Sequence, residues 1–426
     1  MIRSYILFLR RCIRIAFKGD WRYQGWLAFL FLVSLLGLNA YTKQLVHGLG
    51  ITDLSDSVSW GVYIANFTFM VGIADAAVML VIPVYIYRNK SLHDLVLFGQ
   101  LLAVAAIIMS LAFVVVDLGR PDRFLHLMPG IGKMNFPESM LSWDVIVLNG
   151  YLLLSVYICG HLLYSRYNGH EPRAWFYVPF VIFSVFWAVS LHAVTAFLYV
   201  GLGGKPFWNA AIIGPRFIAS AFVSGPALVI LALQCIRRVT NYKIPDKAIM
   251  TLRSIVQVSM FVNVFLLVNE LFKEFYTDTL HVSSAKFLYF GLEGHHSLVP
   301  WIWTAVVFNL TAMVLLALPY SRSMRFLNVA CVLAIVGIWI EKGMGMVVPG
   351  FIPTALGEIT DYTPTLNETL ICLGIWAFGL FCYTIFIRMS LPVLEGKFTF
   401  SNADDWKHSD DKRLEVNTSS NSSLSS

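Results

Sequence analysis

Ten long apolar stretches divide this chain of 426 residues, and they constrain its fold more than any other feature. Each holds about 18–30 residues, and a helix that rises about 1.5 Å per residue crosses a hydrocarbon core of about 30 Å over that length. We therefore expect an all-α integral membrane protein with ten transmembrane helices. The expected spans are residues 24–46, 58–87, 95–116, 141–164, 175–199, 217–236, 249–272, 298–318, 324–341 and 368–390.

The composition excludes a soluble globular protein. Hydrophobic residues make up 58% of the chain and charged residues only 13%, whereas about a quarter of the residues in soluble domains are charged. The mean hydropathy is +0.69. The net charge of +6 does not indicate a nucleic-acid partner, because the basic residues follow the expected membrane topology. The expected surroundings of the chain are a lipid bilayer.

Long and short connections alternate between the expected helices. The long ones are residues 117–140, 200–216, 273–297 and 342–367, and the short ones are 88–94, 165–174, 237–248 and 319–323. Most of the 31 lysines and arginines lie on the side of the short connections and of both termini. The positive-inside rule then places both termini in the cytoplasm and the long loops outside, in the periplasm of a Gram-negative cell. We expect the cytoplasmic membrane of a bacterium or archaeon.

The two ends of the chain differ from the apolar middle. Residues 1–23 interleave Arg3, Arg10 and Arg14 with apolar residues, which predicts an amphipathic helix on the cytoplasmic leaflet rather than a cleaved signal peptide. Residues 396–426 become charged and then rich in Ser and Asn. This composition predicts a disordered cytoplasmic tail.

Cysteines and tryptophans point to packing rather than chemistry. The six cysteines lie almost all within the expected helices and form no CxxC pair, so we expect no iron–sulfur or zinc ligation by this chain. Tryptophans near helix ends are typical of the membrane–water interface. The residues assigned to this belt are Trp60, Trp143, Trp208, Trp301 and Trp303.

Polar side chains inside the expected helices are the candidates for function, because a charged group in a bilayer is costly unless it is paired or hydrated. Nearly all of them fall in the outer half of the membrane, and only Asp75 lies deeper, about 25 Å below the outer surface. The outer group is Asn66, Asp117, Asp144, His192, Glu270 and Glu341. This pattern predicts a polar cavity that opens outward, with a proton route leading inward through Asp75.

Each candidate also has a structural interpretation. Asp144, Glu270 and Glu341 can cap helices or pair with loop arginines at the interface. His192 can be a hydrogen-bonded packing residue, and Asn66 can join neighbouring helices. For the deep aspartate, the one structural interpretation is pairing across helices.

The histidines argue against haem. A four-helix haem b protein needs axial histidine pairs on facing helices. Of the ten histidines, only His192 is clearly inside the membrane, and His161 lies near the inner end of its helix. Two histidines at opposite depths cannot ligate one iron, so we expect no haem and no metal in this chain.

Several separated motifs resemble the NrfD/polysulfide-reductase (PsrC-like) membrane-subunit family. They follow one another in the family's order, and the resemblance covers about residues 20–395. The motifs are SWGVYIANFTFMVGIADAA at residues 59–77, DLGRPDR at 117–123, Ser-Trp at 142–143, and residues 190–222. Residues 281–303 and 341–357 are most similar to the menaquinol-oxidising DsrP/HmeB branch.

The resemblance implies two four-helix bundles, made of the second to fifth and the sixth to ninth helices, flanked by the first and tenth. The first bundle belongs to residues 24–200 and holds a quinone site near the outer face; the second belongs to residues 201–395. Menaquinone or menaquinol is the implied bound substrate. The implied partner on the long loops is a periplasmic four-cluster iron–sulfur subunit of the ferredoxin type. Further implied partners are a multihaem cytochrome c, a haem b membrane subunit and a heterodisulfide-reductase-like subunit.

The same resemblance assigns candidate site residues. By motif position, the quinone pocket or its proton exit involves Asn66, Asp75, Asp117, Arg120 and His192. Our hypothesis is that His192 bonds a quinol oxygen while Asp75 or Asp117 accepts the proton, because imidazole titrates near neutral pH. Phe67 and Trp187 are the expected quinone contacts. Glu270 and Glu341 form a separate proton path or serve only the structure.

The expected function is therefore electron exchange between menaquinol or menaquinone and the iron–sulfur partner, with proton release or transfer. Catalysis is expected only within a complex. Two alternatives stay open, namely a structural membrane anchor without quinone chemistry and a proton-coupled secondary transporter. For a transporter, Pro83, Pro179 and residues 225–226 would mark broken helices. The two halves of the chain do not repeat these interruptions, which speaks against transport.

Overall fold

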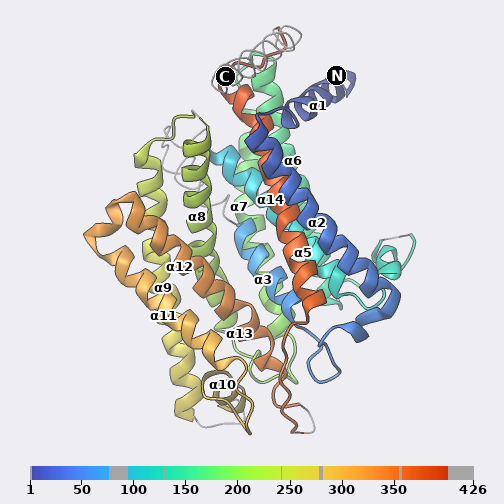
Figure 1. Cartoon of the computed structure of the whole chain (residues 1–426), viewed down its shortest axis with the longest axis vertical. Coiled ribbons are helices and arrows are strands. Elements are labelled where there is room, and N and C mark those ends of the chain that lie inside the picture. Colours follow the sequence, from blue (N-terminus) through green and yellow to red (C-terminus); the bar gives the residue numbers. More distant parts are fainter. Residues whose placement is uncertain are drawn as a thin grey trace, which may run out of the picture.

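The computed structural model describes residues 2–75, 95–128, 130–240, 242–277, 282–354 and 357–401. Over these residues the chain folds into α-helices and short 3-10 turns (Figure 1). The helices are α1 (Ile2–Ala16), α2 (Trp21–His47), α3 (Val62–Ala74), α5 (Leu95–Asp117), α6 (Met140–Tyr167), α7 (Ala174–Val200), α8 (Ile213–Val239), α9 (Asp246–Thr277), α10 (Val282–Tyr289), α11 (Val299–Ala317), α12 (Met324–Lys342), α13 (Met344–Val347) and α14 (Leu366–Leu394). The predicted all-α class is confirmed.

The membrane spans coincide with the expected apolar stretches. Within the described ranges, nine helical segments are long and apolar enough to cross a bilayer, and α3 is a shorter apolar helix. The remainder of its expected span, beyond residue 75, lies outside the described residues. Most helices extend past their expected ends by a few residues; α8, for example, begins at Ile213 and α12 ends at Lys342. The chain is a multi-span integral membrane protein.

The spans form two closed groups of four helices. In the first, α3, α5, α6 and α7 pack in a ring, and in the second α8, α9, α11 and α12 do the same. Helix α3 is the centre of the assembly, because all its residues are buried and it also contacts α8 and α12. The two groups therefore meet along α3, α7, α8 and α12, and this boundary carries most of the buried charge described below.

Helices α2 and α14 form a pair that flanks the first bundle and packs against α5 (Figure 1). Their axes approach closely at two glycines, where a Cβ on Gly37 would lie 2.5 Å from the Cα of Gly374. Small residues at such a crossing let backbones touch, which is the main attraction between helices in a bilayer.

Helix α1 lies at one end of the molecule, beside the last turns of α14 (Figure 1). Its apolar face places Phe8 and Cys12 in a cluster with Tyr167 and Phe398. The backbone N–H of Phe400 donates to the carbonyl of Tyr167 at 2.7 Å. Phe398 and the backbone of Phe400 thus attach the residues directly after α14 to α6. Of the expected disordered tail, residues 402–426 lie outside the described residues.

An aromatic layer lies beneath the long loops, at the end opposite to α1. Trp208 is fully buried, its Nε1 donates to the carbonyl of Met346 at 2.8 Å, and Trp60 stacks on it with ring centroids 5.5 Å apart. The prediction that Trp208 is an interfacial belt residue is wrong, because its ring fills the space between two long loops. Trp301, in contrast, is 55% exposed.

Tyr362, in the last long loop, forms hydrogen bonds to residues at the starts of two helices. The Tyr362 hydroxyl accepts from the backbone N–H of Val62 at 3.0 Å and donates to Glu368 Oε1 at 2.6 Å. Val62 is the first residue of α3, and Glu368 forms a capping box with Thr365 at the start of α14. Burial, and then the neighbouring Glu368 carboxylate, raises the pKa of Tyr362. The hydroxyl thus stays protonated and holds both helix starts in place.

Candidate functional site

The first bundle contains a buried acid–base pair between helices that are far apart in the sequence. Asp75 follows the last turn of α3, His192 lies in α7, and Asp75 Oδ2 is 2.6 Å from His192 Nδ1. The two residues are 2% and 0% exposed. The structure thus brings together the two residues that the sequence placed at the centre of the site.

Both members of this pair have polar atoms without a hydrogen-bond partner among the described residues. They are Asp75 Oδ1 and both ring nitrogens of His192, of which Nδ1 makes the close ion-pair contact with Asp75, and the hydroxyl of Tyr151 on α6 is in the same situation. Tyr151 is close enough to Asp75 for the two to interact electrostatically. Buried polar atoms almost always have partners, so these atoms are candidates to contact a bound molecule, although the amides of Gln100 and Asn263 also lack a partner among the described residues.

Further hydrogen bonds lead from the pair toward the loops. Thr195, in the same helix as His192, donates to Asp144 Oδ1 at 3.0 Å. Closer to the end of α7, the Tyr199 hydroxyl lies 2.6 Å from Thr68 Oγ1 on α3. Asp144 is therefore a buried partner of another helix, and this bond is neither the helix cap nor the pairing with a loop arginine that its structural interpretation expected.

Asn66 joins three helices rather than facing a cavity. Its Oδ1 accepts from Trp339 Nε1 on α12 and from Trp376 Nε1 on α14, both at 3.0 Å. Its Nδ2 donates to the carbonyl of Val62 at 2.8 Å. These bonds occupy the amide, so the structure gives Asn66 a packing role at the junction of the two bundles.

The two expected aromatic contacts lie in the first bundle but have different surroundings. Phe67 is 1% exposed and belongs to the core of the molecule. The Nε1 of Trp187, on α7, donates to the carbonyl of Val147 at 2.8 Å, and its ring packs so closely on Gly150 that a Cβ there would overlap it. Trp187 thus fastens α7 to α6.

Asp117 and Arg120 lie away from the Asp75–His192 pair. Asp117 closes α5, and its Oδ1 is buried without a hydrogen-bond partner among the described residues. The charged group that acts on it is Glu368, in the first turn of α14. Arg120 is exposed and donates to Asp122, which lowers the pKa of Asp122. The structure therefore does not bring these two residues into contact with His192.

The second bundle contains an ion-pair network centred on an arginine of α8. Arg216 Nη2 lies 2.7 Å from Glu341 Oε1, and Arg216 Nη1 pairs with Glu270 Oε2. Asn309 of α11 donates to Glu341 Oε2 at 2.5 Å. Both glutamates are thus paired with arginine, as their structural interpretation expected, but the arginine belongs to a helix and not to a loop.

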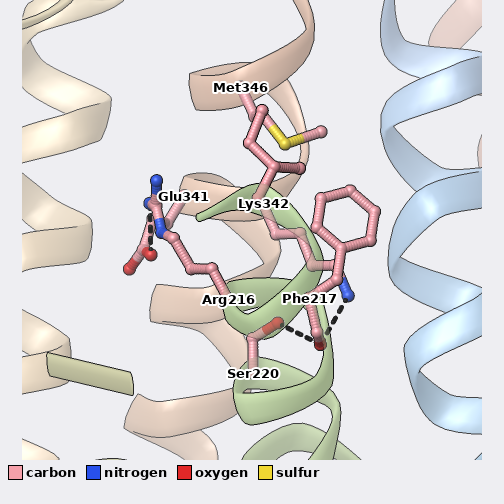
Figure 2. Close-up of a pocket in the computed structure, with 7 residues that line it drawn as sticks. Arg216, Phe217, Ser220, Glu341, Lys342 and Met346 are labelled. Carbon is pink, nitrogen blue, oxygen red and sulfur yellow. Dashed lines mark hydrogen bonds and ion pairs between the residues drawn. The ribbon is translucent and has the colours of Figure 1, made fainter. Parts of the chain in front are cut away.

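Lys342 lies between this network and the first bundle. Its ammonium donates to the carbonyl of Phe217 at 3.3 Å and lies 4.2 Å from the centre of the Phe217 ring. A Cβ on Gly72 of α3 would lie 3.6 Å from Lys342 Nζ, one turn before Asp75. Figure 2 shows a small pocket here, with Lys342 reaching toward Phe217 and Arg216 toward Glu341.

Sequence reasoning missed both of these cations for one reason. The expected spans began at residue 217 and ended at residue 341, so Arg216 and Lys342 fell one position outside a helix and counted as loop charges. In the structure they lie in α8 and α12. A basic residue directly beside an apolar span, facing an excess of acids within the spans, is the signal that could have identified them.

The arrangement fits proton transfer better than ligation of a metal. A carboxylate in contact with one imidazole nitrogen orients the ring and leaves the other nitrogen to exchange a proton. Across the described ranges, no three His, Cys, Asp or Glu side chains come together in a way that could hold a metal ion. Among the buried polar groups, His192 contacts Asp75, and Thr195, one turn further along α7, donates to Asp144.

Residues 50–350, which include both helix bundles, match the family described as polysulphide reductase, NrfD. This chain belongs to the NrfD family. The matched region contains Asp75, His192, Arg216 and Lys342, and the resemblance inferred from the motifs is confirmed.

Three relatives show how similar the chain is to known redox proteins. It is 24% identical over 377 residues to the Hdr-like menaquinol oxidoreductase integral membrane subunit of Archaeoglobus fulgidus, covering 84% of this chain and 91% of that protein. It is 26% identical over 400 residues to a Halobacterium salinarum protein named provisionally as a dimethyl sulfoxide reductase membrane subunit, covering 84% and 88%. Over 234 residues it is 23% identical to a selenate reductase subunit of Mesobacillus selenatarsenatis, covering 47% and 54%.

Proposed function

We propose that this chain is the quinone-interacting membrane subunit of a respiratory redox complex. It exchanges electrons between menaquinol or menaquinone and a periplasmic iron–sulfur subunit. Its relatives are named as subunits of a menaquinol oxidoreductase, a dimethyl sulfoxide reductase and a selenate reductase, and the first two names specify the membrane. The enzymes differ, and the feature common to these names is a subunit that serves a redox enzyme. This supports the quinone side of the reaction as the task of the present chain.

The contact between Asp75 and His192 carries the proposal. Oxidation of a quinol releases two electrons and two protons, so the site must take protons from the hydroxyl groups as the electrons leave for the partner. His192 Nε2 is free of partners among the described residues, while Nδ1 is held 2.6 Å from Asp75. In this proposal Nε2 accepts a quinol proton and Asp75 stabilises the resulting imidazolium.

The long loops are the proposed docking surface for the partner subunit. In the connection between α5 and α6, several apolar side chains are about half exposed although they lie outside the spans. They are Leu125, Met128, Ile131 and Phe136, with 52%, 48%, 63% and 50% exposure. Exposed apolar groups clustered outside the bilayer favour a protein partner. With the long loops in the periplasm and both termini in the cytoplasm, this surface faces an iron–sulfur subunit and any further redox subunits.

A comparison of two histidine variants tests the proposal. In the purified complex, His192→Ala should lower the rate of menaquinol-driven reduction of the partner's clusters about a hundredfold or more, the size of effect expected for a general base. The matched control is His161→Ala, since His161 lies in the same bundle, stacked between Tyr157 and Tyr177. It should turn over normally. Normal turnover of assembled His192→Ala would refute the role of His192.

Binding of a quinone analogue separates the proposal from its alternatives. A structural anchor would assemble with the complex but bind no analogue, whereas the proposed subunit binds it in a manner that menaquinone displaces. Uptake of a solute by the reconstituted chain would favour a transporter. The structure offers that alternative little support, because α7 and α8 continue without a break through Pro179 and Pro226. Pro83 lies outside the described residues.

A further inference from the structure

We propose that Lys342 is a positioning residue that keeps Asp75 ionised and thereby ready to support a proton on His192. This inference rests on the proposed function, because it concerns the proton acceptor of the same site. It assigns a role to a cation of the second bundle in the chemistry of the first. Lys342 contacts neither the quinol nor His192 in this account and acts through its charge.

The first argument is the position of the ammonium group. Lys342 is the last residue of α12 and is only 6% exposed, and its Nζ lies beside Gly72 of α3, at the boundary between the bundles. The charged groups that act on it are Asp75, Arg216 and Glu341. Within a low-dielectric interior such interactions extend well beyond contact distance.

The second argument is that Lys342 has no carboxylate of its own among the described residues. Its partners there are a carbonyl oxygen at 3.3 Å and an aromatic ring at 4.2 Å. A buried ammonium with neutral partners is costly unless an unbalanced negative charge lies nearby. Asp75 is such a charge, because its contact with His192 balances it only when the imidazole is protonated.

The third argument is the charge of the cluster as a whole. We define the charged cluster as Asp75, Arg216, Glu270, Glu341 and Lys342. Three carboxylates face two cations, which leaves one negative charge while His192 is neutral. A single proton on His192 therefore makes the surroundings neutral overall. Without Lys342 the cluster would carry two negative charges, and the buried Asp75 would itself hold a proton to relieve them.

This reasoning predicts opposite results for two substitutions. Lys342→Met, similar in length but uncharged, should lower kcat for menaquinol oxidation by the purified complex about tenfold or more, while KM changes less than about twofold. Lys342→Arg keeps the charge and should retain at least about a third of the wild-type kcat. If Lys342→Met assembles poorly, Lys342→Gln provides a second neutral variant. Wild-type kcat in an assembled neutral variant, or equal impairment in Lys342→Arg, would overturn the proposal.

Infrared difference spectra give a readout that a purely structural role would not change. In the wild type, the Asp75 carboxylate should be ionised before quinol is added. In the neutral variant, the carbonyl stretch of a protonated carboxylic acid should already be present, and adding Asp75→Asn should remove it. An ionised Asp75 in the resting neutral variant would contradict the inference. If His192→Ala is inactive while the neutral variants are not, this inference fails and the proposed function stands; if the wild type binds no quinone analogue, both fail.

Discussion

The two bundles differ in how their buried charges are paired, although each has buried polar atoms that lack a hydrogen-bond partner among the described residues, such as Asp75 Oδ1 in the first and Asn309 Oδ1 in the second. In the first, Asp75 meets His192, and each keeps a polar atom without a partner among the described residues. In the second, Arg216 engages both Glu341 and Glu270, and an amide donates to the first of these glutamates. An arginine surrounded by carboxylates stabilises a fixed geometry and exchanges no proton. An aspartate–histidine pair with open positions can gain or lose one.

The two clusters of buried charged residues have different tasks in our account. Both clusters consist of residue types that are costly inside a bilayer, and the sequence alone presents them as equivalent candidates. The two clusters differ in the partners of their charged side chains. The second bundle uses its charges to hold α8, α9 and α12 together, and we propose that the first uses its pair for chemistry. Lys342 lies where the two meet.

Removing the arginine should have the largest effect on stability. Arg216→Met leaves two glutamates buried without a counter-charge, and breaking a buried pair in this way costs about 3–5 kcal/mol. The expected result is a clear fall in melting temperature and in the yield of assembled complex. Thermal unfolding in detergent, followed by fluorescence, measures it. A melting temperature equal to that of the wild type would show that the network contributes nothing to the second bundle.

Asn66 provides a smaller test of the same division. Asn66→Leu removes the acceptor of two tryptophan N–H groups, and an unsatisfied buried donor costs about 1–3 kcal/mol. The melting temperature should therefore fall, though less than in Arg216→Met. Trp376→Phe, which removes one of the two donors, should have a weaker effect. Loss of quinone-analogue binding at an unchanged melting temperature would instead assign Asn66 to the pocket, as its motif position suggested.

Arg120 should show the smallest effect of all. It is exposed and pairs with Asp122 in its own loop, and such pairs contribute little to stability. Arg120→Gln should leave both the melting temperature and the affinity for a quinone analogue unchanged. A large drop in affinity would show that the loop after α5 closes over the quinone, and the boundary of the site would have to move outward.

Much of the fold follows from the sequence because a chain that crosses a bilayer must form long apolar helices. Within the described ranges, the expected apolar spans coincide with helices, since length and hydropathy alone decide which segments can cross. The same rule failed at the aromatic layer. Trp208 is a tryptophan near a helix end, as belt residues are, but the long loops cover its ring and bury it. Loop structure depends on long-range contacts, such as the bond from Trp208 to Met346, which no local pattern encodes.

For the candidate site, the sequence predicted residue types better than their partners. Asp75 and His192 were singled out by depth and chemistry, and their contact could not be foreseen because the two residues lie far apart along the chain. Arg216 and Lys342 were missed because each lies one residue outside an expected span. Asp117 was grouped with the pair by motif position, and in the structure it closes α5, away from their contact.

The central claim is that Asp75 and His192 act as one proton acceptor, and a double-mutant cycle tests it most directly. The measurement is the rate of menaquinol-driven reduction of the partner's clusters in Asp75→Asn, in His192→Ala and in the double variant, each purified as an assembled complex. The account predicts that each single change slows the reaction about a hundredfold and that the double variant is no slower. Losses that multiply in the double variant, or near-normal rates in either single variant, would contradict it.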